Sequence, residues 1–193
     1  NNELKETTYW NPKSKIRPTT FNDLNTSKKK LKELLKSSIK SRLISDVPIG
    51  TFLSGGTDSS IISAIAQDVN NSPINTFSIG FKEAKYNESK YAKKVANFLG
   101  TNHNEFIITE NEAIDQLEHI IEHFDEPFAD QSALPTMLVS KMAKKHVTVC
   151  LSGDGGDELF MGYGSYNWAK RINHPIYNKL RKPISKILSH SSN

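Results

Sequence analysis

The stretch Ser54-Gly55-Gly56-Thr57-Asp58-Ser59-Ser60 decides the fold class of this chain. It follows the apolar run from Val47 to Leu53 and opens an apolar-periodic segment from Ser59 to Val69, which indicates a loop between a strand and a helix. The two glycines allow the backbone to approach an anion closely, and the amides at a helix start point toward it. Further donors are the serine hydroxyls of Ser54, Ser59 and Ser60. The stretch predicts a phosphate-binding turn.

This turn is not a Walker A loop, because it lacks the Gly-Lys-Ser/Thr sequence and contains no lysine. A turn without lysine, but with Asp58 available to hold Mg²⁺, is suited to binding pyrophosphate as a leaving group. We therefore expect cleavage of ATP at the α-phosphate.

Outside the turn, apolar periodicity predicts alternating strands and helices. We expect helices over 27–45, 59–69, 87–99, 109–124 and 133–145, and strands over 47–53, 74–81, 105–108 and 147–151. Thr109 and Glu112 form a predicted capping box, and residues 9–21 are expected to be an extended linker. The alternation predicts an α/β fold, a Rossmann-like parallel sheet with helices on both faces. Ligands bind at the carboxyl ends of the strands of such sheets.

A second glycine-rich turn follows the last predicted strand. Its sequence from Leu151 to Phe160 is LSGDGGDELF, with Gly162 and Tyr163 soon after. It places acids, a hydroxyl and glycines at the end of an adjacent strand, facing the first turn. Hard cations take carboxylate ligands, so we expect Asp58 and Asp157 to share the Mg²⁺ that bridges the phosphates.

The charge distribution argues against a nucleic-acid partner. The 193 residues carry a net charge of +4, but residues 51–163 contain 8 Lys and Arg against 16 Asp and Glu. An acidic centre suits metal and nucleotide chemistry better than a phosphate backbone. No apolar run approaches the ~18 residues of a membrane span, so no membrane partner is expected. The single cysteine, Cys150, lies in an apolar run expected to be a buried strand; it cannot form an intrachain disulfide, which favours a reducing, cytoplasmic setting.

The string SGGTDS between strand and helix resembles the signature of the PP-loop ATP pyrophosphatase superfamily. This resemblance implies an adenine nucleotide alpha hydrolase-like fold that binds ATP and forms adenylates. The second turn, extended to Tyr163, is similar to the LSG(E/D)GxDE(L/V)F…GY block of the asparagine synthetases. The segments 46–50 and 124–130 are also typical of that family, and the likeness runs from about Tyr9 to Tyr163.

The family resemblance implies roles for individual residues. The implied ATP-binding residues are Leu53, Ser54, Gly55, Gly56, Asp58, Ser59, Ser60, Ile79, Ser152 and Gly153. Leu53, Ile79, Ser152 and Gly153 are the set expected at the adenosine. The implied metal ligands are Asp58 and Asp157, and the implied catalytic residues are Asp154, Asp157 and Glu158. Asp154 stands where several relatives have glutamate, so its carboxylate is one methylene closer to the backbone.

The implied reaction is ATP-dependent amidation of aspartate to asparagine through β-aspartyl-AMP, with release of AMP and pyrophosphate. It requires ATP, Mg²⁺, aspartate, and ammonia supplied from glutamine by a glutaminase domain of the same full-length chain; a homodimer is compatible with it. The expected organisation is a linker from that absent domain over 1–25, an ATP-binding synthetase domain over 26–165, and the start of a truncated helical carboxyl-terminal region over 166–193. The family's catalytic lysine is expected downstream of Asn193.

Two other interpretations stay open. A protein with the same fold can adenylate another carboxylate, as the β-lactam-forming synthetases and other amidotransferases do, and the features that discriminate them are expected beyond this chain. A tRNA-modifying PP-loop protein fits the sequence pI of about 9.0. That interpretation requires a basic stripe and usually reactive cysteines, whereas the centre is acidic and the one cysteine is apolar in context.

Overall fold

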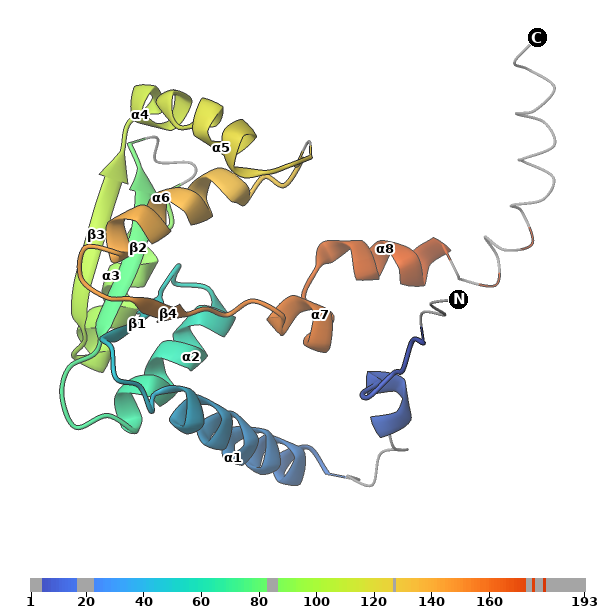
Figure 1. Cartoon of the computed structure of the whole chain (residues 1–193). Helices are drawn as coiled ribbons and strands as arrows, with labels where there is room; N and C mark the ends of the chain where they lie inside the picture. Colours follow the sequence, from blue (N-terminus) through green and yellow to red (C-terminus); the bar gives the residue numbers. More distant parts are fainter. Residues whose placement is uncertain are drawn as a thin grey trace, which may run out of the picture.

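The computed structural model describes residues 5–16, 23–82, 87–126 and 128–172, together with Pro175 and Lys179. Within them lie four strands (Figure 1), β1 Ile49–Phe52, β2 Asn75–Phe81, β3 Asn102–Ile108 and β4 Val149–Leu151. The described helices are η1 Pro12–Lys15, α1 Leu24–Arg42, α2 Thr57–Asp68, α3 Ser89–Leu99, α4 Glu110–Asp115, α5 Leu117–His123, α6 Ala133–Ala143, α7 Gly156–Phe160 and α8 Gly164–Ile172.

The strands form one parallel sheet in the order β3-β2-β1-β4. Gly50 on β1 lies opposite Asn75 on β2 and Cys150 on β4, which fixes the register of the three strands. Since the strands are parallel, β1, β2 and β4 all end at the same edge of the sheet. The predicted Rossmann-like fold class is confirmed by this topology.

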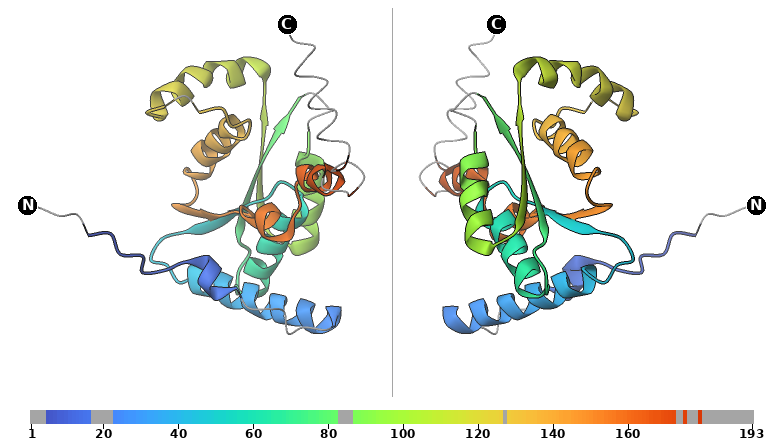
Figure 2. Two further views of the ribbon diagram at one scale, coloured as in Figure 1. Left: turned by 90° about the vertical axis from the view of Figure 1, so that its right-hand side faces the viewer. Right: turned by 90° about the vertical axis from the view of Figure 1, so that its left-hand side faces the viewer.

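Helices cover both faces of the sheet, as Figure 2 shows with α4 to α6 on one side and α2 and α3 on the other. One core cluster joins Phe77 of β2 to the α6 side chains Val139 and Ala143. A second joins Leu53, at the end of β1, to Ala92 and Ala96 of α3. A third packs α1 against α2 through Ile39, Ala66 and Ile74. Burial of these apolar groups holds the layers together.

Several element boundaries follow from local backbone chemistry. The predicted capping box at the start of α4 is confirmed, because the Glu112 N–H donates to Thr109 Oγ1 at 3.3 Å and the Thr109 N–H donates to Glu112 Oε2 at 2.8 Å. Gly100 ends α3 in the left-handed region, with φ of 69°. Asp23 caps α1 by accepting from the N–H groups of Asn25 and Thr26.

The structure corrects three predicted elements. Strand β3 begins at Asn102 rather than 105, because pairing with β2 over seven residues outweighs the polar side chains at its start. The helix predicted over 109–124 is divided at Gln116, whose N–H donates to Ala113 O in a tighter turn. The predicted linker 9–21 contains the helix η1, capped by Asn11; its part beyond residue 16 lies outside the described residues.

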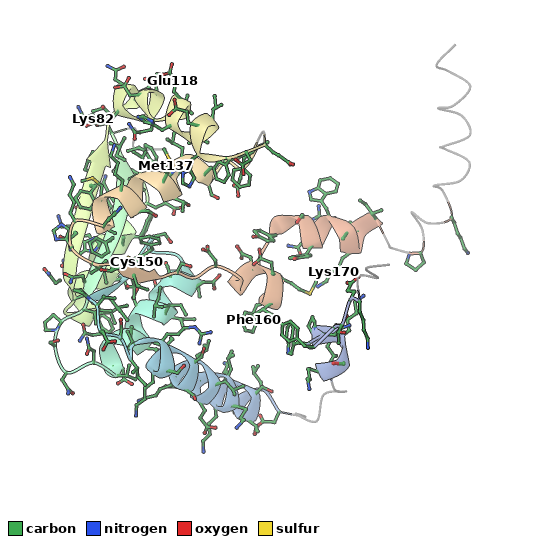
Figure 3. All side chains as sticks on the ribbon, viewed as in Figure 1. Lys82, Glu118, Met137, Cys150, Phe160 and Lys170 are labelled. Atoms are coloured by element: carbon green, nitrogen blue, oxygen red, sulfur yellow. The ribbon has the colours of Figure 1, made fainter. Side chains whose placement is uncertain are left out.

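The strand around Cys150, which the sequence predicts to be buried, is only partly buried in the structure. Strand β4 has three residues, and in the described part of the chain it pairs with β1 alone. Val149 is therefore 41% exposed. Figure 3 shows Cys150 on this strand and Phe160 on α7, away from the sheet.

Helices α7 and α8 extend away from the sheet (Figure 1). Large apolar side chains are exposed along them, namely Leu159, Phe160, Met161, Tyr163, Trp168 and Ile172. None of the helices in the described residues is both long and apolar enough to span a membrane.

Candidate functional site

A cavity of about 770 Å³ opens at the carboxyl edge of the sheet, where β1, β2 and β4 end. The chain leaves β1 toward β2 on one side, whereas β4 lies on the other side of β1. This reversal of strand order is the position at which open α/β sheets bind ligands. The volume suits a small organic molecule of nucleotide size.

The first glycine turn is built around two serine hydroxyls. Ser59 Oγ accepts from the Ser54 N–H at 3.2 Å and donates to Gly56 O at 3.2 Å. It also lies 2.9 Å from Ser54 Oγ, which accepts from the Gly56 N–H at 3.2 Å. These hydroxyls shape the turn from within. Gly55 has φ of 86°, and a β-carbon there would lie 2.6 Å from the backbone nitrogen of Ala92, so this position requires glycine.

The start of α2 is open toward the cavity. Its N-cap residue, Gly56, provides no side-chain hydrogen bond to the helix. Thr57 and Asp58, the first two residues of the helix, line the cavity wall. The first N–H groups of a helix have no partner within it, and together with the helix dipole they attract anions. This end of the cavity therefore suits phosphate oxygens.

The second glycine turn lies directly against the first. A β-carbon on Gly153 would be 2.8 Å from the backbone nitrogen of Ser59 and 3.0 Å from the carbonyl carbon of Asp58. The turn then passes through Gly155, which has φ of 89° and caps α7. The predicted convergence of the two turns is present, because only a bare α-carbon at Gly153 permits this approach.

Four carboxylates line the cavity, Asp58 from α2, Glu88 from the N-cap of α3, Asp154 from the second turn and Asp157 from α7. Asp154 is exposed and its Oδ2 accepts from the Ser152 hydroxyl at 2.8 Å. Asp58 and Asp157 are partly buried. No group of three or more metal-ligating side chains occurs among the described residues. The donor set nevertheless fits Mg²⁺, which binds one or two carboxylates and takes its other oxygens from phosphates and water.

Of the predicted site residues, ten line the cavity, namely Leu53, Ser54, Gly56, Asp58, Ser59, Ile79, Ser152, Gly153, Asp154 and Asp157. Gly55 instead packs on α3. Ser60 Oγ is enclosed, and it has no hydrogen-bond partner in the described structure.

Glu158, expected to be catalytic, does not line the cavity. Its Oε1 accepts from the Tyr163 hydroxyl at 2.6 Å. This hydrogen bond raises the pKa of Tyr163 to about 12 and lowers the pKa of Glu158. The chain turns back between the two residues at Met161, which has φ of 58°. Glu158 therefore faces a neighbour on its own turn.

The cavity is also lined by residues outside the set predicted individually as site residues. These are Phe52, Thr57, Phe77, Ser78, Phe81, Glu88, Pro135, Thr136, Val139 and Gly162. The residues beside Ile79 were implied by the same strand end. Nothing in the sequence indicated that α6 residues line the cavity, because the position of a helix over the sheet is set by tertiary packing.

Comparisons with known proteins identify the relatives of this chain. A family model for asparagine synthase matches residues 30–191. A glutamine-hydrolysing asparagine synthetase of Bacillus subtilis is 40% identical over 162 residues, which are 84% of this chain and 25% of that protein. A putative glutamine-hydrolysing asparagine synthetase of Methanocaldococcus jannaschii is 47% identical over 141 residues, 70% of this chain and 27% of that protein.

The chain thus spans about a quarter of the length of these relatives. A solved NH3-dependent NAD synthetase from Campylobacter jejuni aligns with 70% of this chain and 60% of its own, at a TM-score of 0.48 and 15% identity. The family match covers most of the chain and includes both glycine turns. On the grounds of this family match and of the 40% and 47% identities, the chain belongs to the asparagine synthase family.

Proposed function

We propose that this chain is the ATP-binding part of an asparagine synthetase and that it forms β-aspartyl-AMP from aspartate and ATP. The observation that carries the proposal is the contact between the two glycine turns at the open start of α2. This contact supports one binding site that extends over both turns, with phosphate donors on one side and carboxylates on the other.

The nucleotide would bind with its phosphates at the first turn and its adenosine beside β2. Backbone amides at the start of α2, around Thr57, would hold the β- and γ-phosphates. Leu53, Ile79, Ser152 and Gly153 line the same cavity and would contact the adenosine. Phe77 and Val139, which lie behind this part of the cavity wall, are buried in the core and make that side of the cavity apolar.

The metal would bind between Asp58 and Asp157. Both carboxylates line the cavity beside the phosphate end, and the remaining ligands would be phosphate and water oxygens. When bound, Mg²⁺ neutralises charge on the leaving pyrophosphate. The protein itself positions the reactants and supplies preorganised donors, so it needs no nucleophile of its own.

In the first step, an oxygen of the aspartate β-carboxylate forms a bond to the α-phosphorus, and the bond from that phosphorus to the bridging oxygen of pyrophosphate breaks. In the second, ammonia attacks the acyl carbon and loses a proton, and AMP leaves with the original carboxylate oxygen. Asp154 would guide aspartate or accept the proton; the proposal is supported by its carboxylate, which lines the cavity and accepts a hydrogen bond from Ser152. Glu158, which accepts a hydrogen bond from the Tyr163 hydroxyl, would have the lesser role of holding that tyrosine.

The proposed organisation keeps residues 26–165 as the synthetase unit, with 1–25 as a linker and 166–193 as the start of a further helical region. Ammonia would come from glutamine through a glutaminase domain outside this chain. The relatives from Bacillus subtilis and Methanocaldococcus jannaschii carry glutamine hydrolysis in their names, which supports this partner.

The position of bond cleavage tests the proposal. The full-length protein is incubated with ATP, Mg²⁺, ammonium and aspartate whose β-carboxylate carries ¹⁸O, and the products are separated and weighed by mass spectrometry. We expect asparagine, pyrophosphate and AMP that contains one ¹⁸O. Formation of ADP and unlabelled phosphate would contradict the assignment of the first turn. Labelled AMP from a different carboxylic acid, with none from aspartate, would contradict the acceptor alone.

A further inference from the structure

We propose that Gly156 and Gly162 are positioning residues, each a bare α-carbon surface against which one carboxylate of the metal site is seated. Gly156 lies against the Asp58 carboxylate and Gly162 against the Asp157 carboxylate, and we call these two contacts the first and the second seat. The inference rests on the proposed function, because it takes these two aspartates as the ligands of Mg²⁺.

The first seat joins the two turns. A β-carbon on Gly156 would lie 2.6 Å from Asp58 Cγ and 3.1 Å from Asp58 Cβ, and its nearest neighbour would be Asp58 Oδ2. All three of the nearest atoms thus belong to one side chain. Asp58 is on α2, whereas Gly156 begins α7. The second turn therefore limits where the carboxylate of the first can lie.

The second seat lies within the return of the chain after α7. A β-carbon on Gly162 would be 2.9 Å from Asp157 Cγ and closer still to Asp157 Oδ1. The Gly162 N–H donates to Asp157 O at 3.0 Å. Met161 has a positive φ and reverses the direction of the chain after α7. Tyr163, the residue that follows Gly162, is held by the hydrogen bond from its hydroxyl to Glu158. The backbone thus holds Gly162 beside the Asp157 carboxylate.

The obstacle to a side chain at these two glycines is contact with the aspartate carboxylates, not the backbone conformation. The described glycines with positive φ are Gly55, Gly100 and Gly155. Neither Gly156 nor Gly162 is among them, so alanine fits their backbone conformation. Gly164, two residues after Gly162, lacks a positive φ, and a β-carbon added there would have nothing within 4 Å. Alanine at Gly164 is therefore a matched control from the same segment.

Magnesium makes such seats useful because it demands near-ideal octahedral geometry at short ligand distances. Groups that orient metal ligands change metal affinity by about 10- to 100-fold when they are altered. An added methyl group at either seat must displace an aspartate oxygen, so we expect a loss of that size in the affinity for Mg²⁺ in the presence of ATP.

The experiment measures metal binding in the full-length protein, without turnover. ATP affinity is titrated calorimetrically over a series of Mg²⁺ concentrations for the wild type, Gly162→Ala, Gly156→Ala and Gly164→Ala. We expect the half-saturating Mg²⁺ concentration to rise about 10- to 100-fold for the first two variants and to stay unchanged for Gly164→Ala. Thermal unfolding without ligand identifies any variant that fails to fold. Gly162 is exposed, so Gly162→Ala decides the matter if Gly156→Ala unfolds.

A double-mutant cycle separates positioning from a general structural effect. If Gly162 acts only through its carboxylate partner, Gly162→Ala causes no further loss of Mg²⁺ affinity in the Asp157→Ala background. Equal losses of Mg²⁺ affinity in both backgrounds would overturn the inference. So would an unchanged Mg²⁺ requirement in Gly162→Ala if Asp157→Ala binds Mg²⁺ more weakly. In both cases the proposed function stands. A normal Mg²⁺ requirement in Asp157→Ala would overturn the metal assignment and the inference with it.

Discussion

The α-carbon of Gly153 lies against the backbone nitrogen of Ser59, where an added β-carbon would be 2.8 Å away. A side chain at this point must push one glycine turn off the other, since the opposing atoms are backbone and cannot rotate aside. We expect Gly153→Ala to weaken ATP binding and to lower the free energy of unfolding by about 1–3 kcal/mol. Calorimetric ATP titration and urea unfolding measure the two effects. Wild-type behaviour in both would show that the turns separate at little cost.

Asp58→Asn tests the assignment of a metal ligand in the first turn. The substitution keeps the shape of the side chain and removes its charge. We therefore expect a larger loss of affinity for Mg-ATP than for ATP measured in EDTA, by about tenfold or more. Titration calorimetry under the two conditions gives the comparison. Equal losses in both would indicate that Asp58 affects the nucleotide rather than the metal.

His103 predicts a pH dependence of stability. Its ring nitrogens lie 2.9 Å from Thr76 Oγ1 and 3.2 Å from Ser78 Oγ, and burial lowers its pKa below the ordinary value of 6.5, although the Glu105 carboxylate opposes the shift. The unfolded chain then binds a proton at higher pH than the folded one. The contribution of neutral His103 to the free energy of unfolding is therefore fully present above pH 6.5. It is lost as the pH falls through 6.5 toward the pKa of His103 in the folded protein.

The variant His103→Gln isolates this effect, because it cannot titrate in that range. Urea unfolding of the wild type and the variant at several pH values from neutral to mildly acidic gives the difference in stability. We expect that difference to move in favour of the variant as the pH falls. A difference that is independent of pH would contradict the lowered pKa.

Cys150 is expected to be unreactive in the folded protein. Burial raises the pKa of its thiol to about 11, so very little thiolate forms near neutral pH. We expect alkylation by iodoacetamide at pH 8 to be slow in the native protein and fast in urea, as mass spectrometry would show. Fast native alkylation would revive the interpretations that require a reactive cysteine.

The local features of this chain were predictable because they depend on neighbours in sequence. The two glycine turns, the Thr109 and Glu112 capping box and the alternation of strands and helices are of this kind. Other features depend on tertiary contacts. Strand β3 includes Asn102 and His103 because β2 offers them hydroxyl and amide partners.

The same distinction between local and tertiary features explains which residues of the candidate site were predicted from the sequence. Most residues of the two turns were expected to lie together, since parallel strands bring their carboxyl ends to one edge. The direction of Glu158 could not be foreseen, because it depends on a left-handed backbone at Met161, a residue type that gives no such signal. The cavity contributions of Pro135 and Thr136 depend likewise on how α6 packs over the sheet.

The short strand β4 has a consequence for local opening of the molecule. With three residues paired to β1, it ties the second turn to the sheet by few hydrogen bonds, so this segment is expected to exchange its amide hydrogens early. A nucleotide held by both turns would join residues about 100 positions apart into one cooperative unit. At a ligand concentration 100 times its dissociation constant, the gain is about 2.7 kcal/mol. Bound ATP would then hold the two turns together at this edge of the sheet. It would slow amide exchange at Ser152 to Asp157 together with that of the first turn.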